Sequence, residues 1–294
     1  MSSQILLYHG VTKYKSIGIE NYSGKHIKKS IFEKQMKFLK KYKKVVPFRD
    51  IMKSDNSIAI TFDDTFRNVY TTALPILKKY NLPATFFITT GFIGTKKNFW
   101  VDKLEKYVDF ASVDEIEYNI FGKKNLLKLN SKKNKIFSIN VIKNYLKKQS
   151  PKKRNLILKN LRKILKPKNV IHSKNYQNLS WNEVKELHQP PLYEVGGHTV
   201  NHEILSYLKK KDLDFEIKKC LNDLRKKTRA KIDLFSYPEG QKKHFNIEVI
   251  KTLKKNKIIM SPSAIYGMVS NKQNNFNLKR KMVGFNNLPF PVKK

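Results

Sequence analysis

The stretch Ser57–Asp64 (SIAITFDD) decides the fold, because a short apolar run passes directly into two adjacent aspartates. Such a run, bounded by polar residues, is typical of a buried parallel strand. A helix is expected over 69–80, disturbed locally by Pro75, and a second apolar run (ATFFIT) follows at 84–89. Strand, helix and strand at this spacing indicate a βαβ unit, so the sequence predicts an α/β protein with a parallel sheet or barrel.

The alternation of strands and helices continues on both sides of this unit. Further strands are expected at 3–8, 193–195, 234–237 and 258–260, and further helices at 28–42, 181–188, 213–227 and 246–256. Between about 103 and 178 the pattern changes to a hairpin over 117–130 and two basic amphipathic helices at 133–148 and 151–165. We therefore expect a single domain over 1–294 with an inserted hairpin and helical cap at about 103–178.

Composition narrows the class of protein. With 294 residues, 40% of them hydrophobic, the chain can bury a sizeable core. The single cysteine, Cys220, excludes an intramolecular disulfide and a thiolate zinc cluster, and it fits a reducing compartment. The opening MSSQILLYHGVTK has too short an apolar run for a signal-peptide core, and the sequence has no apolar run long enough for a membrane span. We expect a cytoplasmic protein that can also associate with the inner face of the membrane.

A formal net charge of +38 invites a nucleic-acid interpretation. Only seven of the 61 basic residues are Arg, the residue suited to bidentate contacts with bases and phosphates. Lys, Asn and Ile are abundant together and share A/T-rich codons, so a biased genome also explains the charge. No specific nucleic-acid partner is expected. We instead expect peripheral contact with an anionic membrane surface, which attracts lysine-rich proteins.

Four polar clusters fall where predicted strands end: His9, Asp63-Asp64, the pair in HTVNH at 198–202, and residues 237–240. In α/β barrels the functional residues lie at the carboxyl ends of the strands. Taken alone, Asp63-Asp64 would be a helix cap and the two histidines ordinary polar surface residues. Taken together, two imidazoles and a carboxylate suit Zn²⁺, Fe²⁺, Ni²⁺ or Co²⁺ and leave coordination positions open for water and substrate. Metal sites of this kind are typical of hydrolases.

These segments resemble a known family. ITFDD at 60–64 and HTVNH at 198–202 resemble the first two signature motifs of the polysaccharide deacetylases (carbohydrate esterase family 4, or NodB-homology domain), and FSYPEG at 235–240 resembles the third. The resemblance extends over nearly the whole chain to a branch linked to surface-polysaccharide synthesis, through LLYHGV at 6–11, FWVDKLE at 99–105 and LSWNEVKEL at 179–187. It implies a distorted (β/α)7-type barrel and metal-dependent removal of N-acetyl groups from an amino sugar in envelope polysaccharide, lipopolysaccharide or capsule synthesis.

The resemblance also implies roles for individual residues. Asp64, His198 and His202 would ligate the divalent metal, with Zn²⁺ the first choice, and Asp63 would be the general base. The backbone N–H of Glu239 would help to stabilise the oxyanion. The sugar site of the N-acetylated glycan is expected to be lined by Trp100, Asp102, Tyr237 and Pro238.

Two departures from the family pattern matter. The third motif of the family often carries an Arg that orients the catalytic Asp, whereas Ser236 occupies that place here. Arg280 is the candidate to supply the positive charge instead, and the alternative is that Arg280 is a surface residue. The late Leu-x-His motif is absent, so His9 is the candidate to protonate the leaving amine, with a buried structural histidine as the alternative. Three further histidines are expected at the surface: His172, His188 and His244.

Two other functions stay open on the same residues. Relatives of this fold cleave other non-peptide C–N bonds, so the bond attacked could differ. The chain could also be a catalytically inactive protein that binds a polyanion or a membrane surface, and salt-sensitive binding without hydrolysis would indicate this.

Overall fold

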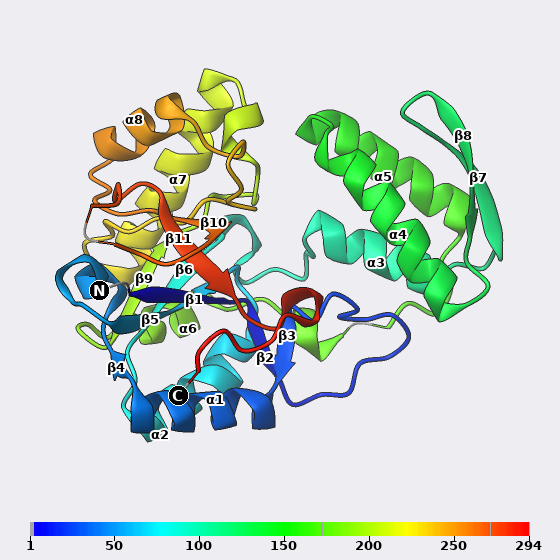
Figure 1. Cartoon of the computed structure of the whole chain (residues 1–294). Helices are drawn as coiled ribbons and strands as arrows, with labels where there is room; N and C mark the ends of the chain where they lie inside the picture. Colours follow the sequence, from blue (N-terminus) through cyan, green and yellow to red (C-terminus); the bar gives the residue numbers. More distant parts are fainter. Residues whose placement is uncertain (1–2, 172, 271, 294) are drawn as a thin grey trace. The chain divides into compact units, whose positions relative to one another are not determined.

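The computed structural model describes residues 3–171, 173–270 and 272–293 and divides into two compact units (Figure 1). Unit 1 comprises Met1–Lys13, Ser23–Lys96 and Gln177–Lys294. Unit 2 comprises Tyr14–Tyr22 and Lys97–Tyr176. The predicted α/β class is confirmed, and the predicted hairpin and pair of basic helices lie in unit 2.

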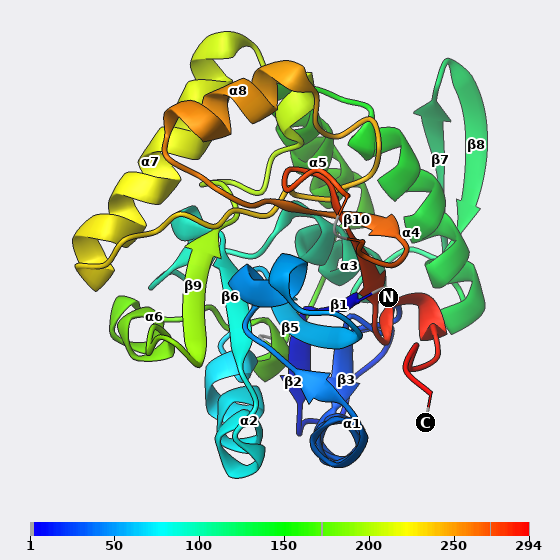
Figure 2. The same cartoon turned by 60° about the vertical axis from the view of Figure 1, so that its left-hand side comes forward.

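Unit 1 is built on a parallel sheet with the strand order β10-β11-β1-β5-β6-β9, and β4 also pairs with β5 (Figure 2). The strands are β1 (Gln4–Tyr8), β4 (Lys44–Val45), β5 (Ser57–Asp63), β6 (Ala84–Ile88), β9 (Tyr193–Gly197), β10 (Pro262–Tyr266) and β11 (Leu278–Met282). Single parallel bridges join Gly197 to Phe235 and Leu234 to Met260, just before β10. These bridges complete a distorted ring of parallel pairings.

The register of the sheet brings one set of strand ends to a common edge. Tyr8 of β1 lies opposite Phe62 of β5, and Phe62 lies opposite Phe86 of β6. The Tyr8 and Phe62 rings stack at 5.4 Å and the Phe62 and Phe86 rings at 5.2 Å, so an aromatic layer closes the core at this level. Because the strands are parallel, the residues just beyond this layer emerge together.

Amphipathic helices cover the sheet of unit 1, as their periodicity predicts. They are α1 (Lys29–Tyr42), α2 (Leu74–Tyr80), α6 (Trp181–Leu187), α7 (Lys210–Thr228) and α8 (Ile247–Lys255). α6 begins with the expected capping box between Ser180 and Glu183. The expected disturbance at Pro75 is a π-helical turn, Val69–Ala73, ahead of α2, since proline cannot donate a backbone hydrogen bond to the preceding turn.

Several elements differ from the sequence prediction. The strands expected at 234–237 and 258–260 are reduced to isolated bridges at Leu234, Phe235 and Met260. β10 and β11 were not predicted, because β10 begins with a proline and β11 reads LKRKM, in which Lys279 separates the buried Leu278 and Arg280. The short strands β2 (Gly10–Thr12), β3 (His26–Lys28) and β4 were also missed.

Unit 2 has its own hydrophobic core. It contains α3 (Trp100–Asp109), the antiparallel hairpin β7 (Glu115–Ile120) and β8 (Lys123–Lys128), α4 (Lys132–Lys147) and α5 (Pro151–Leu165). α3 was not predicted. The core is made of Leu104, Val108, Ile139, Ile142, Leu146, Leu158, Leu161 and Leu165, among others. Within the described residues of both units, no helix combines the length and the apolar character needed to cross a membrane.

Candidate active site

The strand ends of unit 1 bring the predicted metal ligands together. Asp64 follows β5 directly, and His198 follows β9. Nε2 of His202 lies 3.4 Å from Oδ1 of Asp64, and Nε2 of His198 lies 3.9 Å from the same oxygen. One donor atom from each of the three side chains lies within 4.8 Å of the others, so they can share one metal ion.

The surroundings of the histidines favour metal binding. Nδ1 of His198 lies 2.8 Å from the Ser236 carbonyl oxygen, to which it can only donate, so Nε2 keeps its lone pair and faces Asp64. Metal-ligating histidines are commonly oriented in this way by a hydrogen bond from the other ring nitrogen. Burial lowers the pKa of His198, which keeps its imidazole neutral. The donor set and its tautomer therefore fit a divalent cation of the zinc type.

The HTVNH segment is not helical, although its histidines are spaced as on a helix. Thr199 and His202 have positive φ angles of 66° and 58°, so the segment is a tight loop. The Thr199 hydroxyl accepts a hydrogen bond from the His202 N–H, and the carboxylate of Glu216 accepts bonds from the N–H groups of Val200 and Asn201. This loop, rather than one helical face, directs both imidazoles toward Asp64.

Glu216 was missed at the sequence level. It occupies a buried position of α7 next to the core residues Leu213 and Ile217, where an acidic side chain interrupts the apolar face. Burial raises the pKa of Glu216, and the hydrogen bonds from Asn201 and Val200 oppose that effect. A lone carboxylate on the apolar face of a predicted helix is the signal that would have identified it.

Asp63 lies beside the triad and is paired with Arg280. The guanidinium donates from Nη1 to Oδ1 at 2.8 Å and from Nη2 to Oδ2 at 2.7 Å, and Oδ2 lies 3.9 Å from Nε2 of His198. Burial alone would raise the pKa of Asp63, but the charge of Arg280 and its hydrogen bonds lower it to about 2. Asp63 is therefore an ionised carboxylate fixed in a single orientation.

Arg280 is fully buried, so its interpretation as a surface residue is wrong. β11 pairs with β1 in the sheet, which places residue 280 inside unit 1. Its Nε donates to the Ser263 carbonyl at 2.7 Å, and Nη2 donates to the Ser236 hydroxyl at 2.9 Å. The Ser236 hydroxyl itself lies 3.2 Å from Oδ2 of Asp63. Arg280 and Ser236 together thus provide the contact to Asp63 that the family pattern assigns to an Arg in the third motif.

His9 follows β1, and its ring lies against Phe285 with centroids 5.3 Å apart. Its Nδ1 is buried without a hydrogen-bond partner among the described residues. Burial lowers the pKa of His9 to about 4, with Lys25 and Arg280 adding to the effect and Asp63 opposing it. The ring is neutral at neutral pH, so it must gain a proton before it can act as the predicted acid.

The third motif contributes backbone groups to the site rather than side chains that are open to a ligand. Glu239 and Gly240 have positive φ angles of 59° and 52°, which makes a sharp turn at the end of the motif. Tyr237, predicted to line the sugar site, is buried: its ring stacks on Phe245 at 4.3 Å and its hydroxyl donates to the Phe276 carbonyl. Pro238 is also buried. The side chain of Tyr237 therefore belongs to the core, contrary to the prediction.

The other predicted sugar-binding residues, Trp100 and Asp102, lie in α3 of unit 2. The Arg154 guanidinium covers the Trp100 ring at 5.2 Å from its centroid, so that face of the indole is not open for a sugar. Asp102 is buried. Neither position supports the predicted role. His244, expected at the surface, is also buried, and His172 lies outside the described residues.

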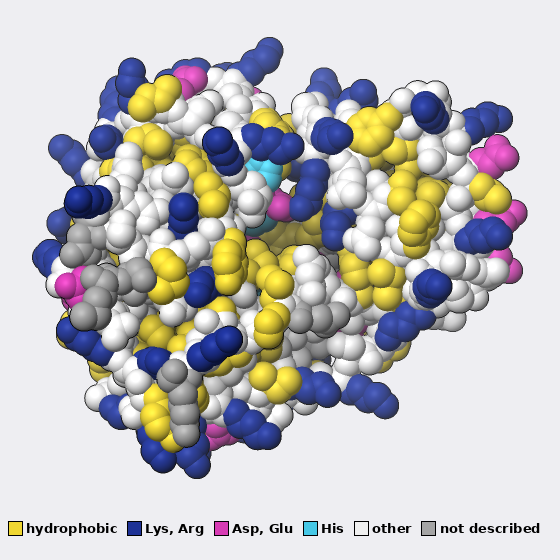
Figure 3. Space-filling model, in the orientation of Figure 1, with side chains coloured by type: hydrophobic (Ala, Val, Ile, Leu, Met, Phe, Trp, Pro, Cys, Tyr) yellow, Lys and Arg dark blue, Asp and Glu magenta, His cyan; other side chains and the backbone are white. Residues whose placement is uncertain are grey.

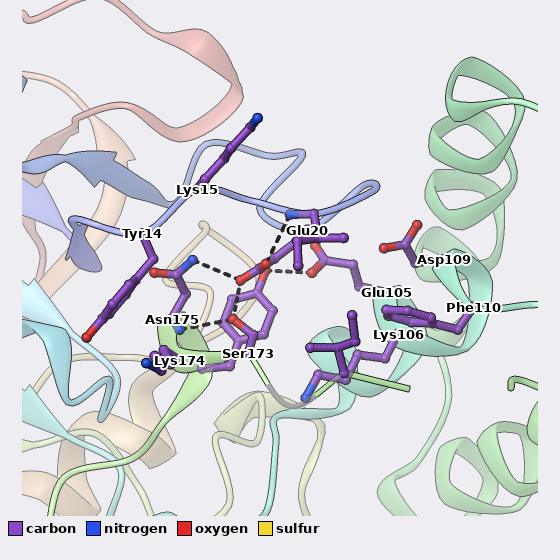
Figure 4. A pocket seen from close by; sticks show the side chains of 13 residues that line it. Tyr14, Lys15, Glu20, Glu105, Lys106, Asp109, Phe110, Ser173, Lys174 and Asn175 are labelled. Carbon is purple, nitrogen blue, oxygen red and sulfur yellow. Dashed lines mark hydrogen bonds between the residues drawn. The ribbon is translucent and has the colours of Figure 1, made fainter. Parts of the chain in front are cut away.

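Unit 2 has a pocket of about 290 Å³ between Tyr14–Tyr22, α3 and residues 171 and 173–176 (Figure 4). Its carboxylates are held by the chain itself. Glu20 accepts hydrogen bonds from Ser173 and Asn175, and Glu105 accepts one from Tyr176 at 2.5 Å. These hydrogen bonds join separate segments of unit 2, so the polar groups of the pocket have a structural role.

Comparisons with known proteins identify similar sequences and folds. Poly-beta-1,6-N-acetyl-D-glucosamine N-deacetylase of Staphylococcus aureus is 36% identical over 96 residues, which are 30% of this chain and 32% of that protein. The match thus spans about a third of the relative's length. Two solved structures share the fold: Streptococcus pyogenes deacetylase PplD in complex with acetate (TM-score 0.61, 16% identity, 98% of this chain and 95% of that one) and IcaB from Ammonifex degensii (TM-score 0.57, 15% identity, 96% and 91%). A sequence model of the family described as polysaccharide deacetylase matches residues 50–259, more than half of the chain. The chain therefore belongs to the polysaccharide deacetylase family.

Proposed function

We propose that this protein is a metal-dependent carbohydrate N-deacetylase, which hydrolyses the acetamido group of an amino sugar in a surface polysaccharide. The observation that carries the proposal is the Asp64, His198 and His202 triad beside an ionised Asp63 that Arg280 holds in place. The staphylococcal relative, named as a deacetylase of poly-beta-1,6-N-acetyl-D-glucosamine, supports an N-acetylated glucosamine polymer as the substrate class.

Asp64, His198 and His202 would hold the metal, and two imidazoles with one carboxylate match Zn²⁺ first, with Fe²⁺, Ni²⁺ and Co²⁺ as alternatives. Such an ion, when bound, supplies Lewis acidity toward the acyl oxygen and lowers the pKa of water. In the hydrolysis, water adds to the acetyl carbon and the C–N bond breaks, giving acetate and a free amine.

Asp63 is the base for the attacking water. The pKa of Asp63 is about 2, so its carboxylate is ionised at neutral pH and able to accept the proton. A low pKa makes Asp63 a weak base, and the hydrogen bonds from Arg280 hold its carboxylate in one geometry. Asp63 therefore contributes to the rate more by its fixed position than by its basicity.

The leaving nitrogen needs a proton for the C–N bond to break. We assign this step to His9, which emerges from β1 at the edge where β5 presents Asp63. Because its pKa is about 4, His9 starts neutral and gains its proton during turnover. The backbone N–H of Glu239, in the turn that ends the third motif, is the candidate donor to the developing oxyanion.

The test is acetate release from N-acetylglucosamine oligomers, with the metal content measured in parallel. Asp63→Asn should lower kcat by about 10² to 10⁴-fold while the metal remains bound. Asp212→Asn, an exposed change in α7 with the same loss of charge, serves as the control and should retain full activity. Amine release without acetate would indicate that another C–N bond is cleaved. Retained metal without hydrolysis of any amide would contradict the deacetylase assignment, and absence of bound metal would favour the inactive binding protein.

A further inference from the structure

Unit 2 contains a long stretch of sequence without acidic residues. Between Glu117 and Glu183 the chain has 18 Lys and Arg residues and no Asp or Glu, so all 23 acidic residues of the protein lie outside this stretch. It is the longest stretch of the sequence without a carboxylate, with 65 residues against 46 after Glu248. The stretch includes all of α4 and α5.

The exposed side of α4 places an apolar ring between lysines. Lys133, Phe137, Asn144 and Lys148 are exposed and follow one another at intervals of four, seven and four residues, as neighbours on one helical face do. The Phe137 side chain is 65% exposed. The opposite side of the helix carries the core residues Ile139, Ile142 and Leu146. Phe137 is therefore an additional apolar residue that the core of unit 2 does not use.

The exposed side of α5 repeats this arrangement. Lys152, Leu156, Lys159 and Lys163 are exposed at intervals of four, three and four residues, and Leu156 is 62% exposed. The buried side of α5 carries Leu158, Leu161 and Leu165. Figure 3 shows hydrophobic and basic side chains interspersed over α4 and α5, with the acidic side chains of this unit at the edge over β7.

We propose that this surface, here called the basic face (the exposed residues of α4 and α5), binds an anionic lipid surface. Each lysine near a negatively charged bilayer contributes about 1 kcal/mol, and exposed apolar side chains between lysines insert at the headgroup boundary. A nucleic acid or a sulfated polymer would use the lysines but would leave Phe137 and Leu156 without an apolar environment. The combination of both residue types selects the lipid.

The experiment measures sedimentation of the whole protein with vesicles of phosphatidylglycerol and phosphatidylcholine, and with vesicles of phosphatidylcholine alone. We expect binding to the anionic vesicles only, weakened by salt. Changing Lys152, Lys159 and Lys163 together to Gln should lower the partition coefficient about 100-fold, at about 1 kcal/mol per lysine. Phe137→Ser combined with Leu156→Ser should also lower it while the preference for anionic lipid remains.

The matched control changes Lys34, Lys37 and Lys41 to Gln, three exposed lysines of α1 in unit 1. This variant has the same net charge as the α5 variant and should bind like the wild type. An equal loss of binding in the control would show that total charge alone is responsible and would overturn the assignment to the basic face. Failure to bind anionic vesicles, with binding to dextran sulfate, would overturn the lipid assignment, as would full binding by the Phe137 and Leu156 variant. Thermal melting of each variant establishes that it is folded.

Discussion

Arg280 forms a bidentate, fully buried ion pair with Asp63, a residue 217 positions earlier in the chain. The pair joins β11, the last strand of the sheet along the chain, to β5, whose strand ends in the site. Three further contacts, with Thr61, Ser236 and the Ser263 carbonyl, fix the guanidinium. The residue proposed as the base therefore depends on a charge from the far end of the sequence.

Removal of one partner of this pair should destabilise the fold. Arg280→Met leaves the Asp63 carboxylate buried without its counter-charge, which costs about 3–5 kcal/mol in the free energy of unfolding. Urea denaturation at pH 7 measures the loss. In a background of Asp63→Asn the same change should cost clearly less, because no anion remains to be compensated. Equal costs in the two backgrounds would mean that Arg280 contributes packing alone.

The histidine loop should be sensitive to Glu216. Glu216→Ala leaves the N–H groups of Val200 and Asn201 without their acceptor, so the loop that presents His198 and His202 loses its geometry. We expect metal affinity to fall about 10 to 100-fold, as for other residues that support a ligand from behind. Competition with a chromophoric chelator gives the affinity. Glu186→Ala, on α6 away from the loop, is the control and should leave it unchanged.

Loss of a ligand should separate metal binding from folding. The His202 side chain is 17% exposed and that of His198 is 1% exposed, so we expect His202→Ala to change the melting temperature of the metal-free protein less than His198→Ala does. The metal content after dialysis should fall sharply, and acetate release should fall with it. A chelator should abolish the activity of the wild type, and re-addition of Zn²⁺ should restore it. Activity that survives complete removal of the metal would refute the role of the triad.

The stability of the protein should depend on pH through His9. Its pKa in the folded protein is about 4 and the ordinary value is 6.5, so the unfolded chain binds the proton more readily between these limits. The contribution of neutral His9 to stability is complete above about pH 6.5 and is lost as the pH falls toward 4. His9→Gln should make the slope of unfolding free energy against pH shallower in this window. An unchanged slope would show that His9 titrates normally.

The sequence predicted the motifs that follow strongly apolar strands. Asp63 ends β5, Asp64 follows it, and His198 follows β9, and the buried runs of these strands leave little ambiguity about where each strand ends. The α/β class and the helices α1, α4 and α5 were predicted by the same periodicity. These features depend on local pattern alone, which a single sequence contains.

The features that were missed depend on contacts distant in sequence. β11 reads as a basic segment, and only its pairing with β1 explains a buried Arg280. Ser236 and Arg280 both contact Asp63, and they also contact each other. These contacts likewise form only when the sheet is assembled. Tyr237 was misjudged because a tyrosine in a motif suggests a ligand contact, whereas here the Phe276 carbonyl satisfies its hydroxyl.

The position of Arg280 has a consequence for synthesis of the protein on the ribosome. The triad and Asp63 are all present once residue 202 has been made, but β11 at Leu278–Met282 supplies the counter-charge and the neighbour of β1. A nascent chain that ends before β11 holds a buried anion in an open sheet. The ion pair of Asp63 can therefore form only after residue 280 has been made, so a nascent chain that already contains the three metal ligands still lacks the contact that orients Asp63.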